Sequence, residues 1–210
     1  MDRAKHPCRD QRTARTAHRA HPRAAAMTDY QQTFNAITRD PRYQRNLDWG
    51  EPRPGHPEGT IRAHIAELDR NLEALRHKLS ETDYWRLRVL IHTHDTFKAE
   101  ATPGVPIRSA NSHASLARTF LAEFCDHDEM LQMLQYHDEP IALWRQHLSK
   151  GKFNRRRLAA LLTNIHDWDL FLAFNIIDAC TQGKDRAGLR WFFQQVTGKV
   201  ASKFTEADIL

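Results

Sequence analysis

Cysteine is scarce in this 210-residue chain: only Cys8, Cys125 and Cys180 are present, and they show no paired spacing. This usage argues against a disulfide framework or a zinc knuckle, and it is typical of a reducing cytoplasm. The chain also lacks an apolar run long enough to cross a membrane. No segment of useful length alternates between apolar and polar residues, as a half-buried strand would. We therefore expect a cytoplasmic protein with no membrane partner and no sheet.

Most of the chain has no net charge at pH 7, counting histidine as neutral. Residues 1–26 carry seven Lys and Arg against two Asp, which accounts for the whole formal charge of +5. The remainder has 24 basic and 24 acidic residues. A nucleic-acid partner would need a basic patch on the folded domain, and the overall charge supplies none. We expect residues 1–26 to be a disordered basic extension and residues 27–210 to form one domain.

Helical periodicity is present where the other patterns are absent. From Ile61 to Leu79 apolar residues recur at alternating steps of four and three, which is the spacing of one helix face. Prolines and glycines separate this segment from others of the same kind. The expected fold is all-α, a compact bundle of about seven to nine helices. The run DLFLAFNIIDAC is apolar nearly all round, which predicts a central helix.

Two expected helix starts have capping signals. Ser112 is placed to cap a helix that His113 opens, because a serine hydroxyl can accept from a free backbone N–H of the first turn. Asp126 and Glu129 have the spacing of a capping box for the helix that leads to His137. Both signals therefore predict helices that begin or end at a histidine.

Histidine and aspartate stand on the apolar faces of these helices. His64, for example, lies three residues after Ile61 and four before Leu68. Burying such a group is costly unless something binds it. A lone histidine on an apolar face is more often a hydrogen-bonded core residue, but here five segments each bring an ionisable group inward. The set comprises His64, His94, Asp95, His113, His137 and Asp178.

This set predicts a metal site. Its donors mix imidazole with carboxylate and lack thiolate, which suits Mn, Fe, Co, Ni or Mg. The order H…HD…H…H…D on a chain of helices resembles the HD superfamily of metal-dependent phosphohydrolases. The resemblance implies that Asp95 bridges two divalent ions, with His64, His94 and Asp178 completing one and His113 and His137 the other. It also implies cleavage of a phosphate ester or anhydride, foremost of a nucleotide, by a hydroxide that bridges the two ions and attacks phosphorus in line.

Lys98 bears on the chemistry. The segment HDTFK resembles the HDxGK pattern of many phosphohydrolases in the superfamily, with Phe97 in place of the usual glycine. In the resembled pattern the lysine faces the phosphate, so Asp95 and Lys98 are the expected catalytic residues. Lys98 is also expected to bind substrate. Arg108, Lys184 and Arg186 are further cations expected at the mouth of the site.

Two other functions remain open. Some members of the resembled superfamily use six such ligands for a di-iron centre that activates oxygen and cleaves C–P or C–C bonds. A non-catalytic helical module that binds a nucleotide is the second alternative, and a complete ligand set argues against it. The sequence leaves the substrate, the metal and a homo-oligomeric state undetermined.

Overall fold

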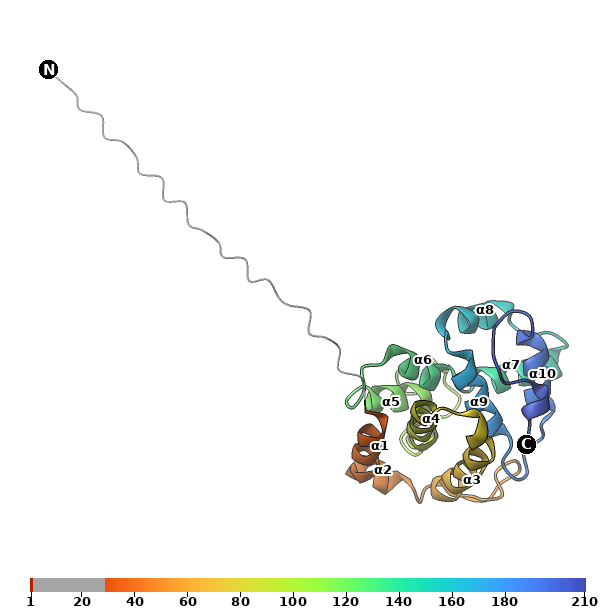
Figure 1. The fold of residues 1–210 in the computed structure, drawn as a ribbon, viewed down its shortest axis with the longest axis horizontal. Helices are drawn as coiled ribbons and strands as arrows, with labels where there is room; N and C mark the ends of the chain where they lie inside the picture. The colour runs from red at the N-terminus through yellow and green to blue at the C-terminus, as the bar shows by residue number, and fades with distance from the viewer. Residues whose placement is uncertain (2–28) are drawn as a thin grey trace.

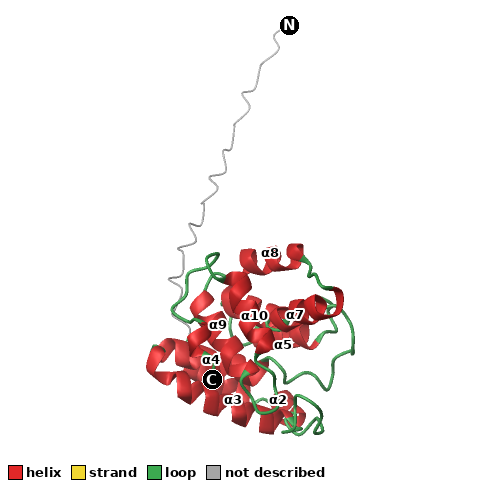
Figure 2. Ribbon diagram, turned by 90° about the vertical axis from the view of Figure 1, so that its right-hand side faces the viewer, coloured by secondary structure: helices red, strands yellow, loops and turns green. Residues whose placement is uncertain are grey.

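The computed structural model describes Met1 and residues 29–210, so nearly all of the predicted basic extension over residues 1–26 lies outside the described residues. The described residues contain α-helices and short 3-10 helices and no strand (Figures 1 and 2). The predicted all-α fold is therefore confirmed. The helix bounds are α1 Tyr30–Arg39, α2 Pro41–Asn46, α3 Ile61–Leu75, α4 Glu81–Thr93, α5 His113–Leu121, α6 Asp128–Tyr136, α7 Glu139–Lys150, α8 Arg155–Asn164, α9 Trp168–Ala179 and α10 Ala187–Val196. Apart from the six-residue α2, these are nine longer helices within the described residues, which agrees with the predicted seven to nine.

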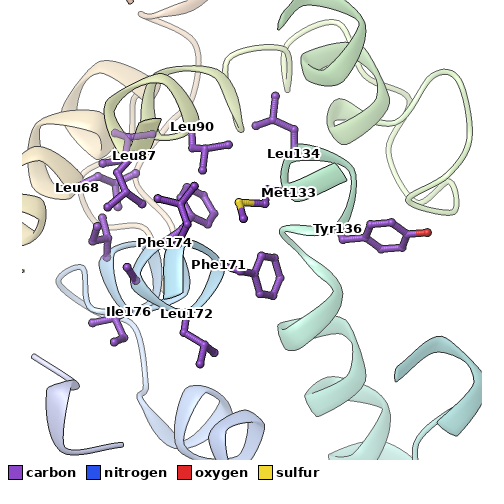
Figure 3. Close-up of a cluster of buried hydrophobic side chains, with 14 of the residues drawn as sticks. Leu68, Leu87, Leu90, Met133, Leu134, Tyr136, Phe171, Leu172, Phe174 and Ile176 are labelled. Atoms are coloured by element: carbon purple, nitrogen blue, oxygen red, sulfur yellow. The ribbon is translucent and has the colours of Figure 1, made fainter. Parts of the chain in front are cut away.

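Helix α9 lies at the centre of the bundle, as its apolar sequence predicts. It packs against α3, α4 and α10. Phe171 and Phe174 project from it among side chains of α4 and α6 (Figure 3). Each of these two phenylalanines is at most 2% exposed. Burial of one phenylalanine side chain stabilises a fold by about 1.5–3 kcal/mol, so this packing fixes the positions of the helices that carry the polar residues.

The predicted start of α5 is confirmed, but the predicted capping box of α6 is wrong. The Ser112 hydroxyl accepts a hydrogen bond from the Ser115 backbone N–H, and α5 begins at His113. Helix α6 begins at Asp128 without a side-chain cap. Glu129 instead accepts from the backbone N–H groups of His166 and Asp167, at 2.9 and 3.0 Å. Its carboxylate therefore ties α6 to the start of α9.

No helix in the described part of the chain combines the length and the apolar character needed to cross a membrane.

Candidate metal centre

The predicted ligand residues converge in two groups inside the bundle. One group consists of His64 from α3, His94 at the end of α4 and Asp178 from α9. The other consists of Asp95, His113 at the start of α5 and His137 just after α6. Within each group the candidate ligand atoms lie within 4.8 Å of one another. This is the division of ligands that the resemblance implied.

In the first group the distances centre on Asp178. His64 Nε2 lies 3.1 Å from Asp178 Oδ1, and His94 Nε2 lies 3.8 Å from the same oxygen. His64 and His94 are both almost fully buried. The three donor atoms are close enough together for all of them to contact one cation placed between them.

In the second group the two histidines face each other. His113 Nε2 and His137 Nε2 are 3.1 Å apart, and each lies 3.8 Å from Asp95 Oδ1. Such close approach of two imidazole nitrogens requires either a proton or a cation between them. The geometry is therefore suited to a shared positive centre.

Asp95 faces both groups with different oxygens. Its Oδ1 faces His113 and His137, whereas its Oδ2 lies 3.4 Å from His94 Nε2 and 3.9 Å from His64 Nε2. The end of α4 makes this possible, because the helix stops at Thr93 and Asp95 lies in the turn that follows. Adjacent residues inside a helix point about 100° apart. Asp95 can thus reach both groups while His94 joins only one.

Backbone carbonyls set the orientation of two ligand rings. His94 Nδ1 donates to the carbonyl of Ile91 at 2.9 Å, and His137 Nδ1 donates to that of Leu134 at 2.7 Å. A proton on Nδ1 leaves the lone pair on Nε2, which is the atom that faces the other ligands. His94 Nε2 is buried and makes no hydrogen bond to any of the described residues. An unsatisfied buried nitrogen is costly, so the donor set fits a bound cation at this point.

The electrostatics of the site also favour positive charge. Burial alone would raise the pKa of Asp95, but His94 and Lys98 outweigh it and hold that pKa well below its usual value. Burial likewise opposes ionisation of Asp178, and Lys184 lowers its pKa in the same way. At His137 burial disfavours the charged ring, yet Asp138 and Asp95 raise its pKa to about 9. Carboxylates that remain ionised in a buried site call for cations.

Of the four cations predicted to bind substrate, two lie at the ligand cluster and two do not. The Lys98 ammonium contacts Asp95 Oδ2, and the Lys184 ammonium lies 2.8 Å from Asp178 Oδ1, so both lie at the ligand cluster. Arg186 instead donates to the backbone carbonyls of Cys180 and Thr181 at the end of α9, at 3.0 and 3.1 Å. Arg108 is exposed in the loop before α5. Lys98 and Lys184 therefore lie at the ligand cluster. Arg186 instead binds backbone carbonyls at the end of α9, and Arg108 is exposed in a loop.

Three polar residues at the site were missed by the sequence analysis. Glu58 Oε1 lies 2.9 Å from both His64 Nδ1 and His56 Nδ1, and the Glu58 side chain is only 4% exposed. Asp138 Oδ2 lies 3.1 Å from His113 Nε2. A signal for Asp138 was present, because it repeats the His-Asp pair directly after a predicted ligand. Glu58 and His56 lie in a loop without periodicity, where no pattern indicates direction.

Comparison with known proteins finds no match for this chain among protein-family models, curated proteins or solved structures. The resemblance to the HD superfamily therefore depends on the residues and their arrangement alone.

Proposed function

We propose that this chain is a metal-dependent phosphohydrolase that cleaves a phosphate ester or anhydride at a dinuclear centre. The observation that carries the proposal is the position of Asp95, whose two oxygens face two separate groups of ligand residues. A carboxylate in that position is suited to join two cations. Imidazole and carboxylate donors suit Mn, Fe, Co, Ni or Mg.

The ligand groups that Asp95 faces support hydrolysis at two metal ions. Two divalent ions, when bound, would supply Lewis acidity toward a phosphoryl oxygen and a nucleophilic hydroxide at neutral pH. The protein's part is to present the Nε2 atoms of its histidines, which the backbone carbonyls of Ile91 and Leu134 orient for two of the rings. Buried helices hold these groups, so little reorganisation is needed when substrate binds.

Lys98 and Lys184 supply the charge for a phosphate. Each ammonium lies on a ligand carboxylate, Lys98 on Asp95 and Lys184 on Asp178. An ammonium has three donors, so each lysine retains N–H groups for a phosphoryl oxygen bound beside that carboxylate. Fixed positive charge at this position would stabilise negative charge that develops on the transferring group.

The same two lysines favour a hydrolase over an oxygenase. A di-iron oxygenase that cleaves C–P or C–C bonds would use a similar set of six ligands but has no need of a cation directed at a transferring phosphate. The placement of two ammonium groups against ligand carboxylates supports an anionic phosphate substrate, and dependence on oxygen is the measurement that distinguishes the two proposals. A non-catalytic nucleotide-binding module would need no such pair of ligand groups.

The deciding experiment combines metal analysis with a phosphate-release assay. The protein as purified is analysed for metal and assayed on nucleotides and phosphate esters with Mn, Co, Ni, Mg and Fe, with and without air. We expect phosphate release under anaerobic conditions. Lys98→Ala should lower turnover by roughly 10²-fold or more and leave the metal content unchanged, since lysine is not a ligand. The exposed Lys152 provides the matched control, and Lys152→Ala should leave turnover as it is.

The opposite pattern of results would overturn the proposal. Absolute dependence on iron and oxygen, without phosphate release from any substrate, would identify an oxygenase and leave the ligand assignment standing. Full turnover by Lys98→Ala would exclude the proposed role of that ammonium.

A further inference from the structure

Positive charge gathers at one end of the bundle, although residues 27–210 are neutral overall. Between Pro140 and His166 the sequence has six basic residues and no acidic residue. The rest of residues 27–210 carries 18 basic and 24 acidic residues. The basic segment covers most of α7, all of α8 and the loop that joins them, and α8 lies at the outer edge of the bundle in both views (Figures 1 and 2). The neutral total therefore hides an uneven distribution of charge.

Five of these six basic side chains have no acidic partner among the described residues. The exception is Arg157, which donates to the two carboxylate oxygens of Glu139 at 2.9 and 2.8 Å and ties α8 to α7. The other five are exposed and form what we call the basic patch: Arg145, Lys150, Lys152, Arg155 and Arg156. The charge of the basic patch is thus free to meet a partner.

The connection between α7 and α8 holds the basic patch on a fixed backbone. The Gly151 N–H donates to the His147 carbonyl at 2.8 Å, and Gly151 has φ +64°, a conformation that favours glycine. The Asn154 N–H donates to the side-chain carbonyl of Gln146, and the Asn154 side chain caps α8 by accepting from the Arg156 N–H at 3.0 Å. Because both helix ends are fixed, a polyanion meets these charges together.

This arrangement of charge is unfavourable unless an anion binds it. Arg155, Arg156 and Arg157 occupy the first turn of α8, which contains no acidic residue. The N-terminal end of a helix carries partial positive charge, so cations there oppose the helix dipole. Five unpaired cations on one short segment also repel one another. Phosphate groups placed against the basic patch would relieve both repulsions.

We propose that the basic patch binds the phosphate backbone of a double-stranded nucleic acid. Lysine and arginine neutralise backbone phosphates without reading the bases. Single strands, in contrast, are usually held by aromatic side chains on which the bases stack. Trp144 and Phe153 are the aromatic residues of the basic segment, but each is half-buried and packs on Trp191, with ring centroids 5.6 and 5.1 Å apart. A duplex exposes its phosphates and needs no such stacking surface.

An anionic membrane surface fits the basic patch less well. Helices that lie on membranes combine their cations with a continuous apolar face. Among the described residues of the basic segment, Leu148 is the one large apolar side chain that is exposed. A single leucine supplies little apolar area for insertion. The proposal is also independent of the proposed hydrolase, because it uses none of the residues of the metal centre.

The test measures the affinity of the whole chain for a short fluorescent DNA duplex by anisotropy over a range of salt concentrations. Released counterions make log Kd depend linearly on the logarithm of salt concentration, with a slope of about 0.9 per phosphate contact. Two patch variants, Lys150→Gln/Lys152→Gln and Arg155→Gln/Arg156→Gln, should each lower that slope by about 2 and weaken binding by about tenfold or more at about 0.1 M salt. Every variant retains the seven basic residues within 1–26, so their contribution is common to all.

The matched control is Arg39→Gln/Arg70→Gln, which removes two exposed cations from α1 and α3 and gives the same net charge as either patch variant. Its salt slope should equal that of the wild type. Arg155→Lys/Arg156→Lys keeps the charge and should keep the slope. The melting temperature of Arg155→Gln/Arg156→Gln should be no lower than that of the wild type, because the substitution removes cations that oppose the dipole of α8.

The other results identify a different partner or none. Equal salt slopes for the wild type and both patch variants would overturn the proposal, as would tighter binding of a single strand of the same sequence. Phosphatidylcholine vesicles that contain phosphatidylserine are the comparison surface. If the patch variants lose binding to these vesicles and bind the duplex as the wild type does, the basic patch belongs to a lipid surface and the proposal is wrong. Phosphate release enters none of these measurements, so the proposed hydrolase can fail without affecting them.

Discussion

Removing metal from the centre should make the stability of the protein depend on pH through His137. This ring is buried, and its Nε2 lies 3.8 Å from Asp95 Oδ1 and 3.7 Å from Asp138 Oδ1. Burial disfavours its charged form, but the two carboxylates outweigh burial and raise its pKa from 6.5 to about 9. In the metal-free protein, a proton on His137 therefore supplies positive charge that a cation would otherwise supply.

The sign and the size of the effect follow from this pKa. A group whose pKa is higher in the folded state contributes stability that is fully present below its unfolded pKa of 6.5. That contribution is lost as the pH rises through about 9. At about 1.4 kcal/mol per pKa unit, the loss between pH 6.5 and the alkaline side of this window is roughly 3 kcal/mol. A metal-loaded centre should lack this slope, because a ligand histidine is already neutral.

The assay is denaturant unfolding of the chelated and the metal-loaded protein at several pH values across this window. The chelated protein should lose stability toward alkaline pH, and chelated His137→Gln should lose the His137 contribution to that slope. His77 is exposed, so His77→Gln should behave like the wild type. A flat stability profile for the chelated wild type would refute the reasoning, as would an unchanged slope in His137→Gln.

Two further predictions concern metal content. Asp95→Asn removes the carboxylate that faces both ligand groups, so both ions should be lost. Circular dichroism should still show a folded helical protein. Full metal content in this variant would contradict the assignment of Asp95 as a shared ligand. Glu58→Gln should weaken metal binding by about 10- to 100-fold, because the carboxylate lies 2.9 Å from His64 Nδ1 and its negative charge favours a proton on that nitrogen, which leaves Nε2 free for the ion. The exposed Glu51 of the same loop is the matched control, and equal metal affinities of Glu58→Gln and Glu51→Gln would show that Glu58 has no orienting role.

Helical periodicity was sufficient to place the residues that lie inside regular elements. His64 is predicted on the inner face of its helix because its neighbours three and four residues away are apolar, and the structure buries it with Ile61 and Leu68. The same reasoning made the helix of Asp178 central. Periodicity carries no information beyond the helix ends, because a loop side chain is directed by turns and tertiary contacts. Glu58 and His56 belong to such a loop, and their positions required the structure.

The failed prediction at the start of α6 has a physical reason of the same kind. Asp126 and Glu129 have the spacing of a capping box, which considers only hydrogen bonds within one helix. In the folded chain the backbone N–H groups of His166 and Asp167 compete for the Glu129 carboxylate. Because these two donors come from a distant segment, local spacing could not predict the outcome.

The phenylalanine in HDTFK is accommodated without loss of the lysine position. A glycine is required where the backbone adopts a positive φ, and among the described residues only glycines do so. Phe97 therefore needs no glycine-like backbone, and its ring is buried 4.8 Å from that of Phe120, measured between ring centroids. The Lys98 N–H donates to the Asp95 carbonyl at 3.0 Å, and the lysine ammonium contacts the Asp95 carboxylate. The buried Phe97 ring thus anchors the turn in the core, and this turn keeps Lys98 beside Asp95.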